Sequence, residues 1–234
     1  MKRTLLVILC FWGMHLVAQT AEIVELKNKM LLEEVGLSGA IGSNFFAPSL
    51  FYQHSWRLGA KQRWDLTYGA RVTSYFGSDI HHASAPPAYY GDPTLEDSVF
   101  VVSPRMSNVA IYVGATYSIK NKVPIGFNID AIGYTFGGDL EGIYTGDGIS
   151  TPVTVNPGSI TALLVGPNDI GMLKAEFFVG YRINNNFTVR AGINNMYTEV
   201  RTPTELQVGN TRYRAENMGG LISLVYMIRP LISR

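Results

Sequence analysis

The chain has 234 residues and a formal net charge of +1 at pH 7, and only 16% of its residues are charged. This balance, without a basic block, gives no indication of nucleic-acid binding. The length allows one domain with a real core or one closed barrel, and frequent glycine and aromatic residues fit many strands joined by tight turns.

Residues 1–20 have the pattern of a secretory signal peptide. Lys2 and Arg3 precede an apolar stretch that is too short to span a bilayer comfortably, and the small residues of "AQTA" supply a cleavage site. Cleavage after Ala18 and cleavage after Thr20 fit equally well. The chain is therefore predicted to be exported.

The only cysteine, Cys10, lies inside this signal, so the mature chain can form neither a disulfide nor a thiolate metal site. Residues 21–32 read as a short periplasmic lead-in. No run of 18 apolar residues follows, which excludes a transmembrane helix. An exported chain of this kind is periplasmic, extracellular, or a β-barrel of an outer membrane.

Beyond the lead-in, apolar and polar residues alternate with the period of two that predicts β-strands. In one example, Trp64, Leu66 and Tyr68 alternate with Asp65 and Thr67. Eight segments show this pattern: 35–45, 49–58, 62–76, 106–119, 123–137, 170–183, 187–200 and 212–228.

The connections between these segments alternate between short and long. Ala60-Lys61, Lys120-Asn121-Lys122 and Asn184-Asn185-Asn186 read as tight turns, because asparagine tolerates the positive φ that such turns need. Residues 77–103 and 138–168 are long loops; a shorter one covers 202–210. The predicted fold is all-β: residues 33–230 form an eight-stranded antiparallel up-and-down transmembrane β-barrel with short periplasmic turns and two long extracellular loops.

Aromatic residues gather near both ends of the predicted strands, as they do at the two interfaces of a membrane barrel. Packing in the core of a soluble sandwich is the alternative reading. The predicted aromatic girdle consists of Trp56, Trp64, Tyr117, Tyr181 and Phe187 near the short turns, and Tyr134 and Tyr197 near the long loops.

Charged residues occupy the opposite phase of the strands, with five positive and four negative side chains that can nearly neutralise one another. The strands are longer than those of soluble sheets and approach or exceed the length needed to cross a membrane. We therefore expect these charges to point inward as a paired network in a narrow lumen. The network consists of Arg63, Asp65, Arg71, Asp130, Lys174, Glu176, Arg182, Arg190 and Glu199.

The signal, the segment "NKVPIGFNIDAIGYTFGGD" and the hairpin "VGYRINNNFTVRAGINN" resemble the small eight-stranded outer-membrane barrels of the OmpA-transmembrane-domain and OmpX type. They look particularly like uncharacterised barrels of Bacteroidota. The resemblance covers roughly residues 33–230 and is one of pattern. Such barrels usually end on an aromatic residue, whereas this sequence continues as "VYMIRPLISR", so Tyr226 would take that place. The resemblance implies an outer-membrane location, and the functions in this group are mixed.

The sequence predicts a non-enzymatic barrel with a structural or binding role through its acidic loops, 77–103 and 138–168. It would contact outer-membrane lipid and a protein or glycan partner, and an accessory role in an envelope machine is compatible with this. A filled lumen argues against a pore. No cofactor and no metal site are predicted, although weak association of Ca²⁺ or Mg²⁺ with the acidic loops stays open.

Two alternatives remain. One is an outer-membrane lipid-modifying enzyme, an acyl hydrolase or transferase, that uses His81, His82 and Ser84 in the first long loop. The other is a soluble lipocalin-like ligand carrier, which needs an apolar cup and a polar exterior.

His54 is a separate anomaly, because its phase matches the lipid-facing residues Tyr52 and Trp56; a local register error is the favoured explanation.

Overall fold

The computed structural model describes residues 29–233 apart from 87, 90–96, 147, 159, 165, 207 and 208. The predicted signal peptide and residues 21–28 of the predicted lead-in lie outside the described residues. In the described part of the chain, no helix has the length and apolar character needed to cross a membrane. The regular structure there consists of thirteen β-strands and one 3-10 turn, η1 (Gly166–Asn168).

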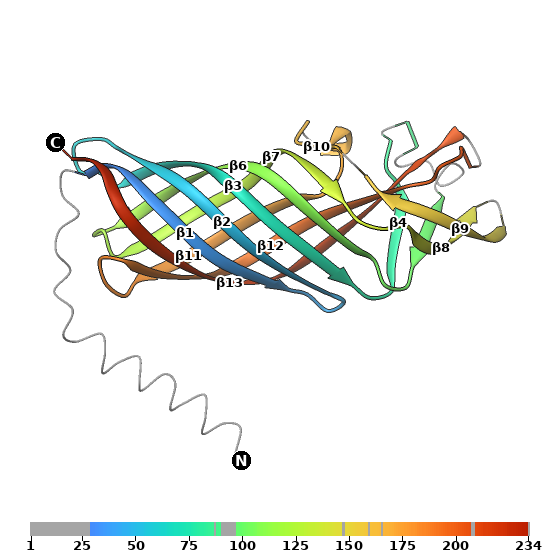
Figure 1. Cartoon of the computed structure of the whole chain (residues 1–234), viewed down its shortest axis with the longest axis horizontal. Coiled ribbons are helices and arrows are strands. Elements are labelled where there is room, and N and C mark those ends of the chain that lie inside the picture. Colours follow the sequence, from blue (N-terminus) through green and yellow to red (C-terminus); the bar gives the residue numbers. More distant parts are fainter. Residues whose placement is uncertain are drawn as a thin grey trace, which may run out of the picture.

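Eight long strands occupy the segments that alternation predicts. Each pairs antiparallel with the next along this series, and the last pairs with the first, so that the pairings close a ring, here called the main ring (Figure 1). Residues 29–32 belong to the first strand, so the predicted lead-in extends too far. The strands are β1 (Lys29–Ile41), β2 (Phe45–Leu58), β3 (Trp64–Gly77), β6 (Arg105–Ile119), β7 (Val123–Phe136), β11 (Leu173–Arg182), β12 (Phe187–Arg201) and β13 (Arg212–Ser233).

The short turns at one end of the main ring form for two different reasons. Lys120 and Asn121 both have positive φ, 50° and 54°, as the two central residues of a type I′ turn require, and the Lys122 N–H donates to the Ile119 carbonyl. Positive φ is absent from the described turn at 184–186, where the Asn184 Oδ1 atom instead accepts hydrogen bonds from the backbone N–H groups of Asn186 and Phe187. The tight turn there is present, but its physical reason is side-chain capping.

The two predicted long loops contain strands of their own, which alternation in the sequence did not reveal. Four of these pair with the end of β12 and the start of β13, at the end of the main ring opposite the short turns. Together they form a second closed series, β12–β9–β8–β5–β4–β13, here called the extension ring. The expected total of eight strands is therefore too low. The added strands are β4 (Ile80–Ser84), β5 (Ser98–Val101), β8 (Leu140–Gly146), β9 (Ile149–Pro157) and β10 (Ile160–Ala162), the last of which pairs with β7.

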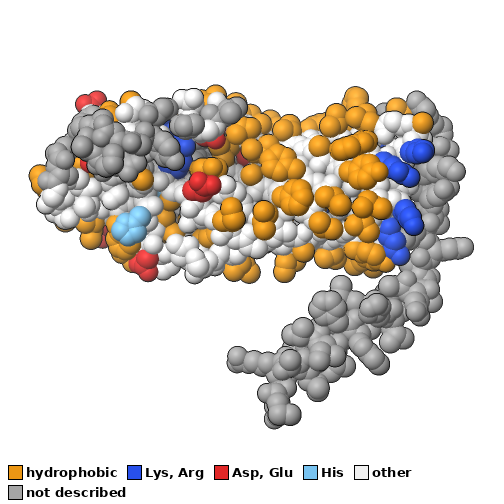
Figure 2. Space-filling view, turned by 180° about the vertical axis from the view of Figure 1, so that it is seen from behind, with side chains coloured by type: hydrophobic (Ala, Val, Ile, Leu, Met, Phe, Trp, Pro, Cys, Tyr) orange, Lys and Arg blue, Asp and Glu red, His pale blue; other side chains and the backbone are white. Residues whose placement is uncertain are grey.

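The main ring is apolar outside and polar inside. Figure 2 shows hydrophobic side chains spread over its wall and Lys and Arg side chains at the short-turn end. Leu37, Ile111 and Ile222 are each more than half exposed on this wall, whereas the alternate positions in the same strands point inward and are buried. This arrangement is the reverse of a soluble barrel.

A bulge in β7 keeps this sidedness consistent along a long strand. Ile111 of β6 faces Ile132, but the next residue, Tyr112, faces Asp130, so Ala131 is one residue too many. An extra residue shifts the alternation by one position. Asp130, just before the bulge in the sequence, therefore points inward, while Tyr134, after the bulge, points outward.

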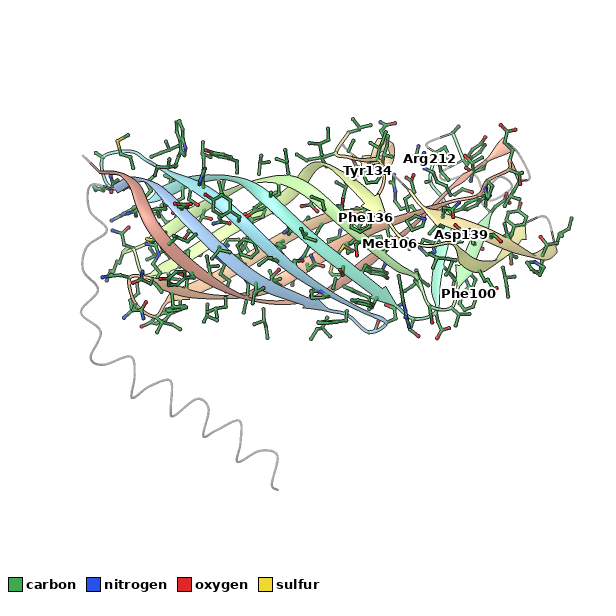
Figure 3. All side chains as sticks on the ribbon, viewed as in Figure 1. Phe100, Met106, Tyr134, Phe136, Asp139 and Arg212 are labelled. Atoms are coloured by element: carbon green, nitrogen blue, oxygen red, sulfur yellow. The ribbon has the colours of Figure 1, made fainter. Side chains whose placement is uncertain are left out.

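An apolar cluster fills the end of the lumen next to the extension ring. It combines side chains from the main ring, such as Tyr75 and Met106, with side chains from the extension ring, such as Val99 and Tyr144. Figure 3 shows Met106 where the two rings meet. The buried members are Ala40, Phe45, Ala47, Tyr75, Val99, Val101, Met106, Tyr144, Val155, Met172, Met196, Val200 and Tyr213.

Candidate functional site

The middle of the lumen contains four charged side chains in direct contact. The Arg71 guanidinium lies 2.5 Å from Asp130 and 2.9 Å from Glu176, and the Lys174 ammonium lies 2.8 Å from the other Glu176 oxygen. All four side chains are at most 5% exposed. We call this group the central ion cluster; its two positive and two negative charges cancel.

Neutral groups complete the coordination of the central ion cluster. The Lys174 ammonium also donates to the hydroxyls of Ser49, at 2.8 Å, and Ser38, at 3.2 Å. Asp130 accepts a hydrogen bond from the Lys174 backbone N–H at 3.0 Å. Ionic groups out of water are stable only when their hydrogen-bonding capacity is used in this way. The cluster is thus an interlocked unit that joins β1, β2, β3, β7 and β11.

A second charged layer lies nearer the short turns. Asp65 is 3.3 Å from the Arg57 Nε atom and 3.8 Å from Arg182, while Glu34 accepts hydrogen bonds from Gln53 and from Ser55. We call this layer, together with Arg190, the lower ion cluster.

An aromatic group contacts both ion clusters. Phe51, Tyr112 and Val225 pack together inside the main ring, and the Tyr112 hydroxyl donates to Gln53 Oε1 at 2.7 Å. The Arg71 guanidinium lies 4.9 Å above the centre of the Tyr112 ring. Charged and apolar side chains therefore lie next to one another in the lumen.

The structure places eight of the nine predicted lumen charges inside. Arg190 is buried with the lower ion cluster, and Glu199 lies near the extension ring, where it pairs with Arg201 and Arg212. Arg63 is the exception: it is exposed just before β3 and donates to the Tyr117 hydroxyl. The alternating pattern in the sequence continues one residue beyond the start of β3, so it wrongly assigned Arg63 to the strand.

Two further buried charges lie on strands of the main ring and are missing from the predicted network. Glu34 of β1 and Arg57 of β2 are both buried. Glu34 lies in the middle of β1 but just before the predicted segment 35–45, because β1 begins at Lys29. Arg57 is the penultimate residue of β2, where the alternation ends.

The seven predicted girdle residues all lie on the outer wall, and none is buried. Near the short turns, Trp64 packs against Tyr117 with ring centres 5.0 Å apart, and the Lys122 ammonium lies 5.0 Å from the Tyr181 ring. Figure 3 shows Tyr134 close to the extension end. Aromatic rings and basic side chains thus share one rim of the wall.

His54 is oriented outward, so a register error does not explain its phase. Its two ring nitrogens lie 2.8 Å from the Tyr52 hydroxyl and 2.9 Å from the Tyr68 hydroxyl, and Tyr52 in turn donates to Glu33 at 2.5 Å. This chain of polar groups satisfies the imidazole on an otherwise apolar wall.

The histidines of the first predicted loop point to opposite faces of β4. His82 is completely buried inside the extension ring, and burial lowers its pKa to about 4. His81 is exposed and lies against Phe100, with ring centres 4.6 Å apart. The Ser84 hydroxyl bonds with Asp97 and Asn210, so the three candidate catalytic residues share no hydrogen bond in the described structure. The described residues also contain no group of three potential metal-ligating side chains.

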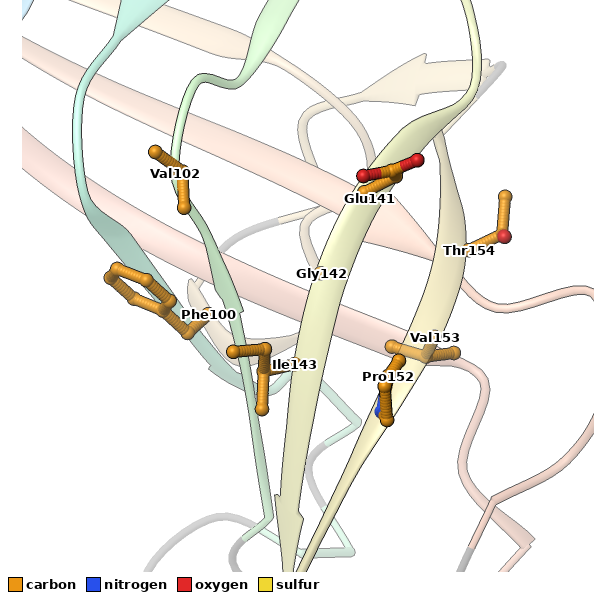
Figure 4. A pocket seen from close by; sticks show the side chains of 8 residues that line it. All are labelled: Phe100, Val102, Glu141, Gly142, Ile143, Pro152, Val153 and Thr154. Atoms are coloured by element: carbon orange, nitrogen blue, oxygen red, sulfur yellow. The ribbon is translucent and has the colours of Figure 1, made fainter.

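The outer face of the extension ring has a groove of about 420 Å³ across β5, β8 and β9 (Figure 4). Strand register aligns Phe100, Ile143 and Pro152 side by side, and His81 extends this row onto β4. Glu141 lies at the same groove. The groove therefore combines an apolar row with one carboxylate.

No protein-family profile matches the chain, and no curated protein matches it. Among solved structures, it is similar to Neisserial surface protein A, with 11% identity, a TM-score of 0.39, and coverage of 86% of this chain and 96% of that one. It is similar to Ail, the attachment invasion locus protein of Yersinia pestis, with 8% identity, a TM-score of 0.36, and coverage of 86% and 98%. A major outer membrane protein of Thermus thermophilus aligns with 11% identity, a TM-score of 0.40, and coverage of 85% and 99%.

Proposed function

We propose that the main ring is an eight-stranded barrel in a bacterial outer membrane, and that it holds the extension ring at the cell surface as a binding platform. The observation that supports this most strongly is the reversed sidedness of the wall. Exposed Leu37, Ile111 and Ile222 suit lipid, while the buried central ion cluster would be a poor core for a soluble carrier. The basic short-turn rim would then face the periplasm.

The platform is proposed to bind without conducting or catalysing. The apolar cluster at the junction of the rings and the layered side chains below it fill the lumen, as expected for eight strands. The separated positions of His81, His82 and Ser84 do not favour acyl transfer, because a nucleophile needs a base within hydrogen-bond reach.

The groove supports a proposal about the chemistry of a partner. Its row of Phe100, Ile143 and Pro152 offers apolar contacts, and Glu141 offers a negative charge. Residues 77–103 and 138–168 contain seven acidic residues and no Lys or Arg. We therefore propose a protein partner that inserts an apolar side chain flanked by basic residues.

The first experiment tests the barrel. The mature protein in an isolated outer-membrane fraction is run on a gel with and without boiling. A closed barrel resists unfolding in detergent, so we expect different mobilities of the two samples. A soluble protein whose mobility does not change would contradict the membrane barrel.

The second experiment tests the groove. A photo-crosslinking amino acid is placed at Phe100, inside the groove, or at Ile149, which is exposed on the same extension outside it. On intact cells we expect a defined adduct from position 100 that disappears in an Ile143→Ser background. Equal adducts from both positions, or none from either, would contradict a binding groove.

A further inference from the structure

Arg190 differs from the other buried cations of the main ring in its surroundings. Its side chain points into the lumen from β12 and is 7% exposed. The guanidinium lies 4.5 Å above the centre of the Phe178 ring. Among the described residues, no carboxylate forms an ion pair with it, and its Nε atom is buried without a hydrogen-bond partner.

The charges of the lower ion cluster do not cancel. Counted over the described residues alone, Arg57, Arg182 and Arg190 contribute three positive charges, whereas Glu34 and Asp65 contribute two negative ones, which leaves an excess of one. Asp65 is already shared by Arg57 and Arg182. The central ion cluster is balanced and cannot supply the missing charge.

A second unsatisfied donor lies beside Arg190. Ser223 of β13 is its direct cross-strand partner, is 5% exposed, and also has a buried hydroxyl without a partner among the described residues. Opposite residues on one face of an antiparallel pair have Cβ atoms only about 4.5–5.5 Å apart. Two unsatisfied buried donors, one N–H and one O–H group, therefore belong to directly opposite residues of β12 and β13.

The stem of Arg190 is tightly packed on its other side. Its partner on β11 is Gly180, where an added Cβ atom would approach the Arg190 Cγ atom to 3.1 Å. A larger residue at this position would press on the Arg190 side chain.

We propose that Arg190 and Ser223 form a binding site for a small inorganic monovalent anion, such as chloride, in the short-turn half of the lumen. Such an ion neutralises the excess charge and accepts from both donors, and burial makes this favourable because an unpaired buried charge is costly. A narrow eight-stranded lumen admits only a small ligand.

The test uses the full mature chain folded in detergent, with sodium chloride as the probe. Chloride binding is followed by broadening of the ³⁵Cl NMR line, and the temperature at which unboiled protein loses its folded gel mobility is compared in sodium chloride and sodium gluconate at equal ionic strength. The variants are Arg190→Gln and Ser223→Ala, and Arg63→Gln is the matched control because Arg63 is exposed.

We expect chloride to broaden the line and to raise the transition temperature of the wild type and of Arg63→Gln. In Arg190→Gln both effects should disappear, and in Ser223→Ala chloride should bind at least tenfold more weakly. If Arg190→Gln does not fold, Ser223→Ala decides the matter, because its hydroxyl bonds no other described residue. An unchanged chloride response in either variant, or none in the wild type, would overturn the site and leave the barrel and the groove unaffected.

Discussion

Lys174 is completely buried, yet its ammonium contacts one carboxylate and two hydroxyls. Removing such a charge from water costs several kcal/mol, which only close partners offset. The central ion cluster consequently contributes little as an intact group, but the loss of one member leaves the others unpaired. Its value lies in fixing the relative positions of five strands.

Asp130→Ala tests this dependence. The change removes one partner of Arg71 and the acceptor of the Lys174 backbone N–H, so we expect a loss of about 3–5 kcal/mol of unfolding free energy. Urea unfolding of the protein in lipid vesicles measures it. The exposed Arg63→Gln should change stability by less than about 0.5 kcal/mol. A similar small effect of Asp130→Ala would mean that water replaces the carboxylate.

The buried His82 should make the stability of the extension ring depend on pH. Burial lowers its pKa from the ordinary 6.5 to about 4, so the unfolded state binds the proton first as pH falls. The stability due to neutral His82 is therefore complete above pH 6.5 and is lost as pH falls towards 4, in total about 3 kcal/mol.

Protease cleavage of the extension between about pH 7 and pH 4 would reveal this loss. We expect the wild type to become more sensitive than a His82→Gln variant, which has no titrating imidazole, as pH falls. The exposed His81→Gln should follow the wild type. Parallel curves for wild type and His82→Gln would show that other groups cause the acid sensitivity.

At the scale of elements, the β6–β7 hairpin depends on a turn with two left-handed residues. Lys120 is exposed and has a φ of 50°, a conformation that glycine adopts freely and a β-branched residue resists. We expect Lys120→Gly to be neutral or stabilising by about 0.4–1 kcal/mol. Lys120→Val should cost about 1–3 kcal/mol, which urea unfolding would detect. Equal stability of both variants would mean that the turn has changed type.

The long strands could be predicted because each has one apolar and one polar face over ten or more residues. The strands of the extension ring are shorter, as "IHHAS" of β4 and "SVFV" of β5 show, and their apolar side faces inward, opposite to the main ring. A reader of the sequence expects loops between membrane strands to be polar. The alternation of Val99 and Val101 was the available signal, but two residues are too few to distinguish a strand from a loop.

The candidate sites were predictable to a lesser extent. Charge in the inward phase was sufficient to locate Arg71, Asp130, Lys174 and Glu176, because the period of two determines their side of the wall. Their pairing depends on strand order and stagger, which the sequence does not specify. The groove was beyond prediction for the same reason, since Phe100, Ile143 and Pro152 meet only through the register of three short strands.

At the scale of the whole molecule, the two apolar surfaces should respond differently to charge. Ile111 on the main ring and Ile149 on the extension ring are almost equally exposed, at 56% and 53%. Ile111→Lys places an ammonium in the proposed lipid layer, at a cost of about 2–4 kcal/mol near its midplane. Ile149→Lys meets water and should cost almost nothing.

The amount of heat-modifiable protein in the outer-membrane fraction measures both variants. We expect less of Ile111→Lys and a wild-type level of Ile149→Lys. Equal amounts of the two would place both surfaces in the same solvent and contradict the membrane position of the main ring. The resemblance of the whole chain to OmpX-type and Bacteroidota barrels remains a prediction.

Strands β12 and β13 belong to both rings, and β13 pairs with β1 and β12 in the main ring and with β4 in the extension ring. Neither ring can exist as a closed object without β13. Disruption of residues 212–233 would release the edges of β1, β4 and β12 together, and open strand edges promote aggregation. A folding defect in β13 is therefore predicted to remove the surface platform and its membrane base together, whereas a defect confined to β4, β5, β8 or β9 leaves the pairings of the main ring complete.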